Sequence, residues 1–140
     1  MALPTKLQLE VVTPDRALVR EAVDEVQVPG AEGYLGVLPG HTPLLATLKV
    51  GELCYRVGQE QHFVAIAGGF AEILPDRVII LAQIAERAQD VDLARAEAAK
   101  KRAEDRLAQL PQDFNFERAR VALMKSLVRL QVAARARTRA

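Results

Sequence analysis

Charged side chains in the last third of the chain have the spacing of two helix faces. They fall into two sets, with internal spacings of three, four or seven: Asp92, Arg95 and Arg102, and then Arg118, Lys125 and Arg129. Side chains at such spacings share one side of an α-helix. A guanidinium group can bind phosphate oxygens in a bidentate manner, and a carboxylate can accept hydrogen bonds from a base or a ribose. Two interpretations stay open: a nucleotide site where the faces converge, or a charged surface exposed to solvent.

Hydrolytic and metal chemistry lack the residues that they need. The two histidines, His41 and His62, stand in no recognisable pattern with a nucleophile. The single cysteine, Cys54, lies in an alternating apolar run, so we interpret it as a small buried hydrophobic residue. The sequence has no cysteine pair and no His-x-x-x-His spacing that would bind a metal. We therefore predict no catalytic residue, no metal site and no required cofactor.

The stretch Gly33–Leu45 carries three glycines and two prolines between two apolar runs. Glycine permits backbone angles that other residues avoid, and proline fixes φ. This composition predicts a tightly shaped, exposed and irregular loop. It leaves two roles open: a turn that sets the register of two strands, or a docking surface that presents Tyr34, Leu35 and His41 to a partner.

The residues before position 88 follow the two-residue period of β-strands. Their alternating or continuous apolar runs are Leu7 to Val11, Val23 to Val28, Leu53 to Val57, Phe63 to Ala67 and Val78 to Ala82. A slip at Asp24–Glu25 predicts a bulge in the second run. The turn signals between the runs are Gly51, Gly58, Gly68–Gly69 and Pro75–Asp76. Many short strands without intervening helices predict an antiparallel sandwich or barrel for residues 1–87.

The residues after position 87 follow the period of a helix and lack glycine. Two stripes consist mainly of alanine and leucine: Leu93, Ala96, Ala99, Ala103, Leu107 and Leu110, and then Phe116, Ala119, Leu123, Leu127, Leu130 and Ala134. Asp90 is the predicted N-cap of the first helix, Pro111 ends it, and Asp113 caps the second. We predict an antiparallel α-helical hairpin over residues 88–140, held weakly enough to move because its stripes bury little area.

The charge distribution favours protein partners. The 140-residue chain has a net charge of +1, and no apolar stretch approaches the roughly 20 residues of a membrane span. From Phe114 onward, Glu117 is the single acid among seven cations: Arg118, Arg120, Lys125, Arg129, Arg135, Arg137 and Arg139. An acidic protein surface suits this helix better than nucleic acid, which would require aromatic platforms or a reader motif. We expect a soluble protein that reaches a membrane only through partners.

Two motifs resemble those of a known family. The loop from Gly33 to Leu45 and the predicted turn from Gly68 to Glu72 are similar to conspicuous motifs of the epsilon subunit of bacterial F-type ATP synthases. The length and the two-part layout are similar as well. The resemblance implies a mainly β fold with an added α part: an N-terminal antiparallel β-sandwich of about ten strands, followed by a C-terminal antiparallel α-helical hairpin.

The resemblance also implies a function and a set of partners. An epsilon subunit rides on the central stalk, couples c-ring rotation through the gamma subunit to ATP synthesis, and inhibits ATP hydrolysis through its C-terminal helices, which meet the alpha and beta subunits. It is not catalytic, and it lies at the cytoplasmic side of the cell membrane as part of the complex. The residues implied to dock on the c-ring or on gamma are Glu32, Tyr34 and His41. Those implied to form the inhibitory basic helix are Arg118, Arg120, Lys125 and Arg129.

Epsilon subunits that bind ATP as a regulatory ligand carry Ile or Leu, then Asp, two variable residues, Arg and Ala, and the segment Val91–Ala96 is similar. The resemblance implies an ATP site made of Glu86, Val91, Asp92, Arg95, Ala96, Arg102, Lys125 and Arg129. Val91 replaces a larger aliphatic residue, and Lys125 replaces a typical arginine and its bidentate fork, so we expect weak binding. A different class stays open: an adaptor that binds no nucleotide and presents a basic helical hairpin to an acidic protein.

Overall fold

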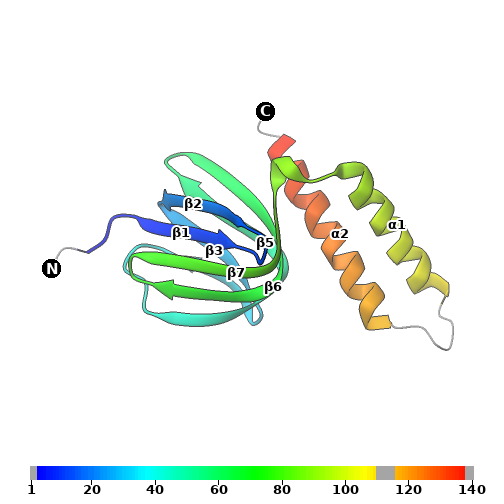
Figure 1. The fold of residues 1–140 in the computed structure, drawn as a ribbon, viewed down its shortest axis with the longest axis horizontal. Helices are drawn as coiled ribbons and strands as arrows, with labels where there is room; N and C mark the ends of the chain where they lie inside the picture. The colour runs from blue at the N-terminus through cyan, green and yellow to red at the C-terminus, as the bar shows by residue number, and fades with distance from the viewer. Residues whose placement is uncertain (1–2, 110–115, 138–140) are drawn as a thin grey trace.

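The computed structural model describes residues 3–109 and 116–137, which form a curled sheet with a helical hairpin beside it (Figure 1). The elements are β1 (Leu7–Val12), β2 (Ala17–Val23), β3 (Glu25–Gly30), β4 (Gly33–Val37), β5 (Leu44–Val57), β6 (Glu60–Leu74), β7 (Arg77–Arg87), the 3-10 helix η1 (Ala88–Asp90), α1 (Leu93–Gln109) and α2 (Phe116–Arg137). One seven-stranded sheet has the order β2-β1-β7-β6-β5-β3-β4. β2, at one edge, contacts β5, so the curled sheet encloses a core as a sandwich does.

The described part of the sandwich has seven strands, whereas we expected about ten. The number is smaller because three of the strands are long. β5, β6 and β7 have 14, 15 and 11 residues, and β5 keeps one register with β6 from Leu44 to Val57. The prediction of turns at Gly51 and Gly68–Gly69 was wrong, since these glycines lie inside strands. Gly69 has a φ of 121°, which glycine adopts without strain, so β6 bends there without ending.

Three features of the N-terminal strands differ from the prediction. β1 pairs with β7 in parallel, whereas the other neighbouring strands pair antiparallel as predicted. Asp24 does not form a bulge inside one strand but separates β2 from β3, and its carboxylate accepts hydrogen bonds from the backbone N–H of Gly58 (2.7 Å) and from Lys6. The first five residues of the predicted irregular loop, Gly33–Val37, form β4, because Val37 is fully buried and pairs with β3.

The core of the sandwich consists of large aliphatic side chains that water does not reach. Burying one Leu or Ile side chain contributes about 1.5–3 kcal/mol to stability. The largest of these side chains come from β1, β5, β6 and β7, with exposed fractions of 0–1%: Leu7, Leu9, Leu53, Ile66, Ile73 and Ile80. This core makes the sandwich the rigid part of the molecule.

The hairpin starts two residues later than predicted. The backbone N–H of Arg95 donates to Oδ1 of Asp92 (3.1 Å), so Asp92 is the N-cap of α1. Asp90 instead ends η1, and the extended backbone of Val91 (φ −70°, ψ 124°) prevents a helix from starting at Asp90. The predicted stop at Pro111 and the predicted cap at Asp113 lie outside the described residues.

Helix α2 holds the hairpin to the sandwich, as Figure 1 shows. α2 packs on β5, β6 and η1, whereas α1 packs mainly on α2. The buried residues of the two helices are mostly small: Ala96, Ala103, Ala119, Ser126, Val132 and Ala133. The predicted hairpin is confirmed, and its buried surface is made of much smaller side chains than the core of the sandwich. Neither described helix is long and apolar enough to cross a membrane.

Candidate functional site

Two carboxylates stand in one row of the sheet beneath α2. Ala65 on β6 pairs with Glu86 on β7 and with Glu52 on β5, so all three side chains share one face. The two carboxylates therefore flank Ala65 at a separation of about 10 Å, which is two strand spacings. The small Ala65 lets α2 approach between them, close to the apolar residues Phe63, Ala88 and Val132.

The first carboxylate, Glu86, binds Arg129 of α2 with two hydrogen bonds. Nε of Arg129 donates to Oε2 (2.6 Å) and Nη2 donates to Oε1 (3.1 Å). Both side chains are less than a quarter exposed. The hydrogen bond to Glu86 raises the pKa of Arg129, and the charges of Glu86 and Asp92 add to this effect against partial burial. Arg129 thus stays charged and is bound to the sandwich in this conformation.

The second carboxylate, Glu52, lies deeper and binds the C-terminal part of α2. Its side chain is about nine-tenths covered. Oε2 accepts hydrogen bonds from Nε2 of Gln131 (3.0 Å) and from Nε of Arg135 (3.0 Å). The Arg135 guanidinium also lies over the Phe63 ring, 5.2 Å from its centroid. No pattern in the sequence marks Glu52 as special, because the register that brings it under α2 is a tertiary feature.

The structure brings some of the predicted ATP-site residues together. Glu86 and Lys125 line a cavity of about 30 Å³ between β6, β7 and α2, and Arg129 binds Glu86. Asp92 lies close enough to act on the charge of Arg129. A cavity of this size holds water but no nucleotide, since ligand pockets have volumes of about 300–1,000 Å³. ATP would have to bind on the surface beside this cavity or after a rearrangement.

The remaining predicted residues of the hairpin are distributed over its surface. Arg95 and Arg102 are exposed on α1, Ala96 is buried and Val91 is half-buried. Of the predicted inhibitory residues, Arg118 and Arg120 are exposed near the start of α2. Arg120 donates to Glu117 (3.0 Å), and this bond raises the pKa of Arg120. The basic residues thus span α2, and Arg129 is paired with Glu86 of the sandwich.

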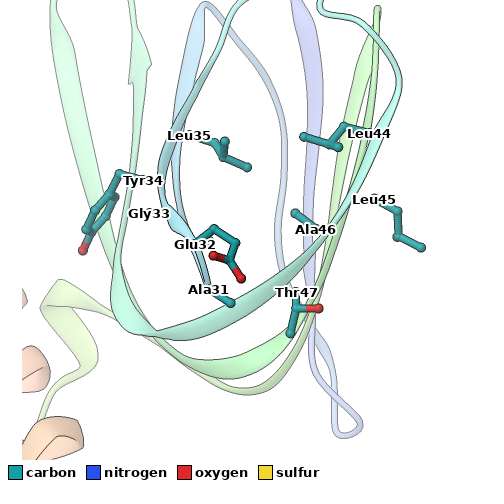
Figure 2. Close-up of a pocket in the computed structure, with 10 residues that line it drawn as sticks. Ala31, Glu32, Gly33, Tyr34, Leu35, Leu44, Leu45, Ala46 and Thr47 are labelled. Carbon is teal, nitrogen blue, oxygen red and sulfur yellow. The ribbon is translucent and has the colours of Figure 1, made fainter.

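A cavity of about 420 Å³ lies at the turn between β3 and β4, beside two of the predicted docking residues. Glu32 and Tyr34 line it together with Leu35, Leu44 and Leu45, and Figure 2 shows Tyr34 and Leu45 on opposite sides of it with Glu32 between them. The Tyr34 hydroxyl accepts a hydrogen bond from the backbone N–H of Glu52 (3.2 Å). The Tyr34 ring also has the Lys49 ammonium 5.0 Å from its centroid.

The third predicted docking residue, His41, lies apart from this cavity. Glu32 precedes β4 and His41 follows it, so they lie beyond opposite ends of a five-residue strand that is about 17 Å long. Nδ1 of His41 is 2.6 Å from the Thr42 carbonyl oxygen. The neighbouring Gly40 donates to the Pro75 carbonyl oxygen (2.7 Å), which fixes this loop on the β6–β7 turn. Glu32 and Tyr34 thus share one surface, and His41 marks another.

An exposed apolar groove was missed by the sequence analysis. Phe70 and Leu81 pair across β6 and β7, and both side chains are more than half exposed. With Val12, Pro14 and neighbouring residues they line a groove of about 330 Å³. Large exposed apolar side chains that cluster in this way mark interaction surfaces. The alternation of β6 contained a signal for this groove. Phe70 and Glu72 lie on one face of the strand and are exposed, whereas Ala71 and Ile73 lie on the opposite face and are buried.

In the part of the chain that the structure describes, no group of three or more His, Cys, Asp or Glu side chains could hold a metal ion. The arrangement instead offers surfaces: an acidic row beneath α2, a cavity at the β3–β4 turn and an apolar groove on β6 and β7. These are features of a binding protein.

Comparisons with known proteins agree along almost the whole chain. The family model described as "ATP synthase, Delta/Epsilon chain, beta-sandwich domain" matches residues 6–88, and the one described as "ATP synthase, Delta/Epsilon chain, long alpha-helix domain" matches residues 89–134. The ATP synthase epsilon chain of Syntrophobacter fumaroxidans is 53% identical over 128 residues, which are 91% of this chain and 96% of that relative. The ATP synthase epsilon chain of Nitratidesulfovibrio vulgaris is 48% identical, over 90% of this chain and 94% of that relative.

A solved structure shares the fold. A chain in the cryo-EM structure of the Euglena gracilis mitochondrial ATP synthase, OSCP/F1/c-ring in rotational state 1, matches with a TM-score of 0.81 at 23% identity. The match covers 96% of this chain and 84% of that chain. The sandwich and the hairpin thus recur together in both comparisons, and the protein belongs to the ATP synthase delta/epsilon chain family.

Proposed function

We propose that this chain is a non-catalytic central-stalk subunit of an F-type ATP synthase. The sandwich would transmit rotation of the c-ring through the gamma subunit to the catalytic subunits, where ATP is made. The observation that carries the proposal is the match of the sandwich and the hairpin together to chains named ATP synthase epsilon chain. This observation favours the rotor subunit over the alternative of an unrelated adaptor. The chain would lie at the cytoplasmic side of the cell membrane through the complex.

The sandwich offers two surfaces for its rotor partners. The cavity at the β3–β4 turn combines the exposed Glu32 carboxylate with Tyr34 and Leu45, which suits the polar loops of a c-ring. The groove with Phe70 and Leu81 is mainly apolar, which suits a lasting contact with gamma. A rotor subunit needs two lasting contacts on one rigid body, and both surfaces are attached to the same core.

The hairpin would supply the regulation. In the docked conformation, Glu86 and Glu52 neutralise Arg129 and Arg135. If α2 leaves the sandwich, Arg129 and the exposed Arg118 and Arg120 become available to an acidic surface of the alpha and beta subunits. Docked α2 would then be the state that permits ATP hydrolysis, and extended α2 the state that inhibits it.

The test is a reconstituted complex that carries the chain without residues 90–140. We expect normal assembly and normal coupling of proton transport to synthesis, because the sandwich keeps its own core. We expect ATP hydrolysis to rise relative to the complex with the full chain. A complex that fails to assemble would contradict the rotor role of the sandwich. A truncated complex with unchanged hydrolysis would contradict the inhibitory role of the hairpin.

A second function, binding of ATP by the hairpin, is favoured by the grouping of Lys125, Arg129 and Asp92 around Glu86. Calorimetric titration of ATP into the full chain, with and without magnesium, tests it. We expect one weak saturable site whose affinity falls about tenfold or more in Arg129→Ala, as one charge-assisted contact is lost. Arg106→Ala, which removes an exposed cation of α1 outside the predicted site, is the control. No binding at millimolar ATP would show that the hairpin responds to protein neighbours alone.

A further inference from the structure

Glu52 is the most deeply buried carboxylate in the described structure, and the predicted nucleotide site does not use it. It stands next to the apolar cluster of Phe63, Ala65, Ala88 and Val132 that joins α2 to the sandwich. Both of its side-chain partners, Gln131 and Arg135, belong to the C-terminal part of α2. Glu86 and Arg129 form a separate pair on the other side of Ala65.

The charged Glu52 side chain is stable in two situations, which are contact with the docked α2 and exposure to water after α2 has left. A buried carboxylate loses its water and is stable only when hydrogen bonds and a positive charge replace that water. The docked α2 provides one amide and one guanidinium, at 3.0 Å each. When α2 leaves, water reaches Glu52 and solvates it again. A partly docked helix that covers Glu52 without Arg135 would leave the charge uncompensated, so docking of this part of α2 should be all-or-none.

We infer that Glu52, Gln131 and Arg135 form a latch, independent of nucleotide, that sets the fraction of time for which α2 is docked on the sandwich. Arg135 is held from both sides, because its guanidinium contacts the Glu52 carboxylate and the Phe63 ring. The regulatory meaning of the latch rests on the proposed function, in which docked α2 is the non-inhibiting state. The latch itself is a property of the isolated chain.

The test uses the full chain in solution without nucleotide. Methyl NMR signals of Ala65 and Val132, both buried in the apolar cluster under α2, report undocking. We expect Arg135→Ala to raise the undocked population about tenfold, the effect of one lost charge-assisted hydrogen bond. Methyl signals of Ile73 and Ile80, both in the sandwich core, verify that the variant stays folded.

A double-mutant cycle separates the latch from a general effect of charge. We expect Glu52→Gln to restore much of the docking in the Arg135→Ala background, because it removes the uncompensated buried charge. Arg106→Ala, on the exposed surface of α1, is the matched control and should leave docking unchanged. The latch would be overturned if Arg135→Ala docked as well as the control variant. It would also be overturned if the effects of Arg135→Ala and Glu52→Gln on docking were additive.

ATP hydrolysis by a complex that carries Arg135→Ala distinguishes the two proposals. If undocking rises in the isolated chain and hydrolysis falls, both the latch and the inhibitory role of the hairpin are supported. If undocking rises and hydrolysis is unchanged, the latch stands and the inhibitory role fails. If undocking does not change in the isolated chain, the latch fails whatever the complex does.

Discussion

The sandwich and the hairpin are stabilised by different kinds of contact. Large aliphatic side chains fill the sandwich, and the largest of them are 0–1% exposed. The hairpin buries mainly alanines, and its attachment to the sandwich combines a small apolar cluster with two acid–base contacts. Burial of large apolar side chains cannot be undone locally without unfolding, whereas a few polar contacts at an interface can exchange with water or with another partner.

Under the proposed function, this difference would let one short chain provide both a rigid coupling and a movable part. The sandwich core lies within residues 7–82 and does not depend on α1 or α2. The hairpin meets β5, β6 and η1 mainly through α2, so we expect it to leave as a unit while the sheet stays intact. The two parts should therefore respond independently to substitutions in either one.

The largest expected effect comes from opening a cavity in the sandwich core. Leu53→Ala removes a fully buried side chain of β5 and should lower the free energy of unfolding by about 2–5 kcal/mol. Val132→Ala, which also removes buried methyl groups but at the α2 interface, is the matched comparison. It should loosen the hairpin and leave the unfolding of the sandwich nearly unchanged. Chemical denaturation followed by methyl NMR of both parts measures this, and equal losses in both parts would contradict their independence.

A second prediction concerns the bend of β6. A Cβ at Gly69 would lie 2.0 Å from the Leu81 carbonyl oxygen and 2.9 Å from the Ala82 Cα, at a φ of 121°. Gly69→Ala should therefore destabilise the sandwich by about 1–3 kcal/mol and displace β7 beside the apolar groove. Gly36→Ala is the control, since a Cβ there meets nothing within 4 Å. Thermal unfolding measures the difference, and Gly69→Ala should melt at a lower temperature than Gly36→Ala. Equal melting temperatures would show that the backbone at Gly69 is not constrained.

The smallest expected effect is a pH dependence confined to the sandwich. The hydrogen bonds from Lys6 and from the Gly58 amide lower the pKa of Asp24 below its usual value. A lowered folded-state pKa adds stability above the unfolded pKa near 4, and that stability is lost as the pH falls through the folded value. Asp24→Asn should therefore flatten the acid side of the stability curve. Hairpin docking should keep its own pH profile in this variant, and a parallel change in docking would argue against two independent parts.

The sequence was sufficient for the layout because local patterns determine it. The two-residue alternation up to residue 87 and the three-to-four spacing beyond it predicted the sandwich and the hairpin correctly. The turns at Gly51 and Gly68–Gly69 were predicted wrongly because glycine is typical of turns, whereas these glycines continue their strands under the pairing of β5, β6 and β7. Local composition cannot reveal whether a glycine ends a strand or bends it.

The site was less predictable because it depends on register. The charge spacing on the helices indicated Arg129 and Lys125, and the structure places both next to Glu86. Glu52 gave no signal, because its position under α2 follows from pairing with Ala65 far along the sequence. Asp92 was recognised as important, but its role as the N-cap of α1 required the backbone of Val91 to be known.

The most direct test of the account is to lock α2 on the sandwich within the assembled complex. Val132→Cys provides a thiol in the cluster that native Cys54 packs against, and a short cleavable reagent with two thiol-reactive groups can join the two thiols. Val132→Ser treated with the same reagent is the control. We expect the locked complex to hydrolyse ATP without inhibition by the hairpin, and we expect cleavage of the link to restore the inhibition. Inhibition of equal strength with the helix locked and released would contradict the central claim that the docked hairpin is the permissive state.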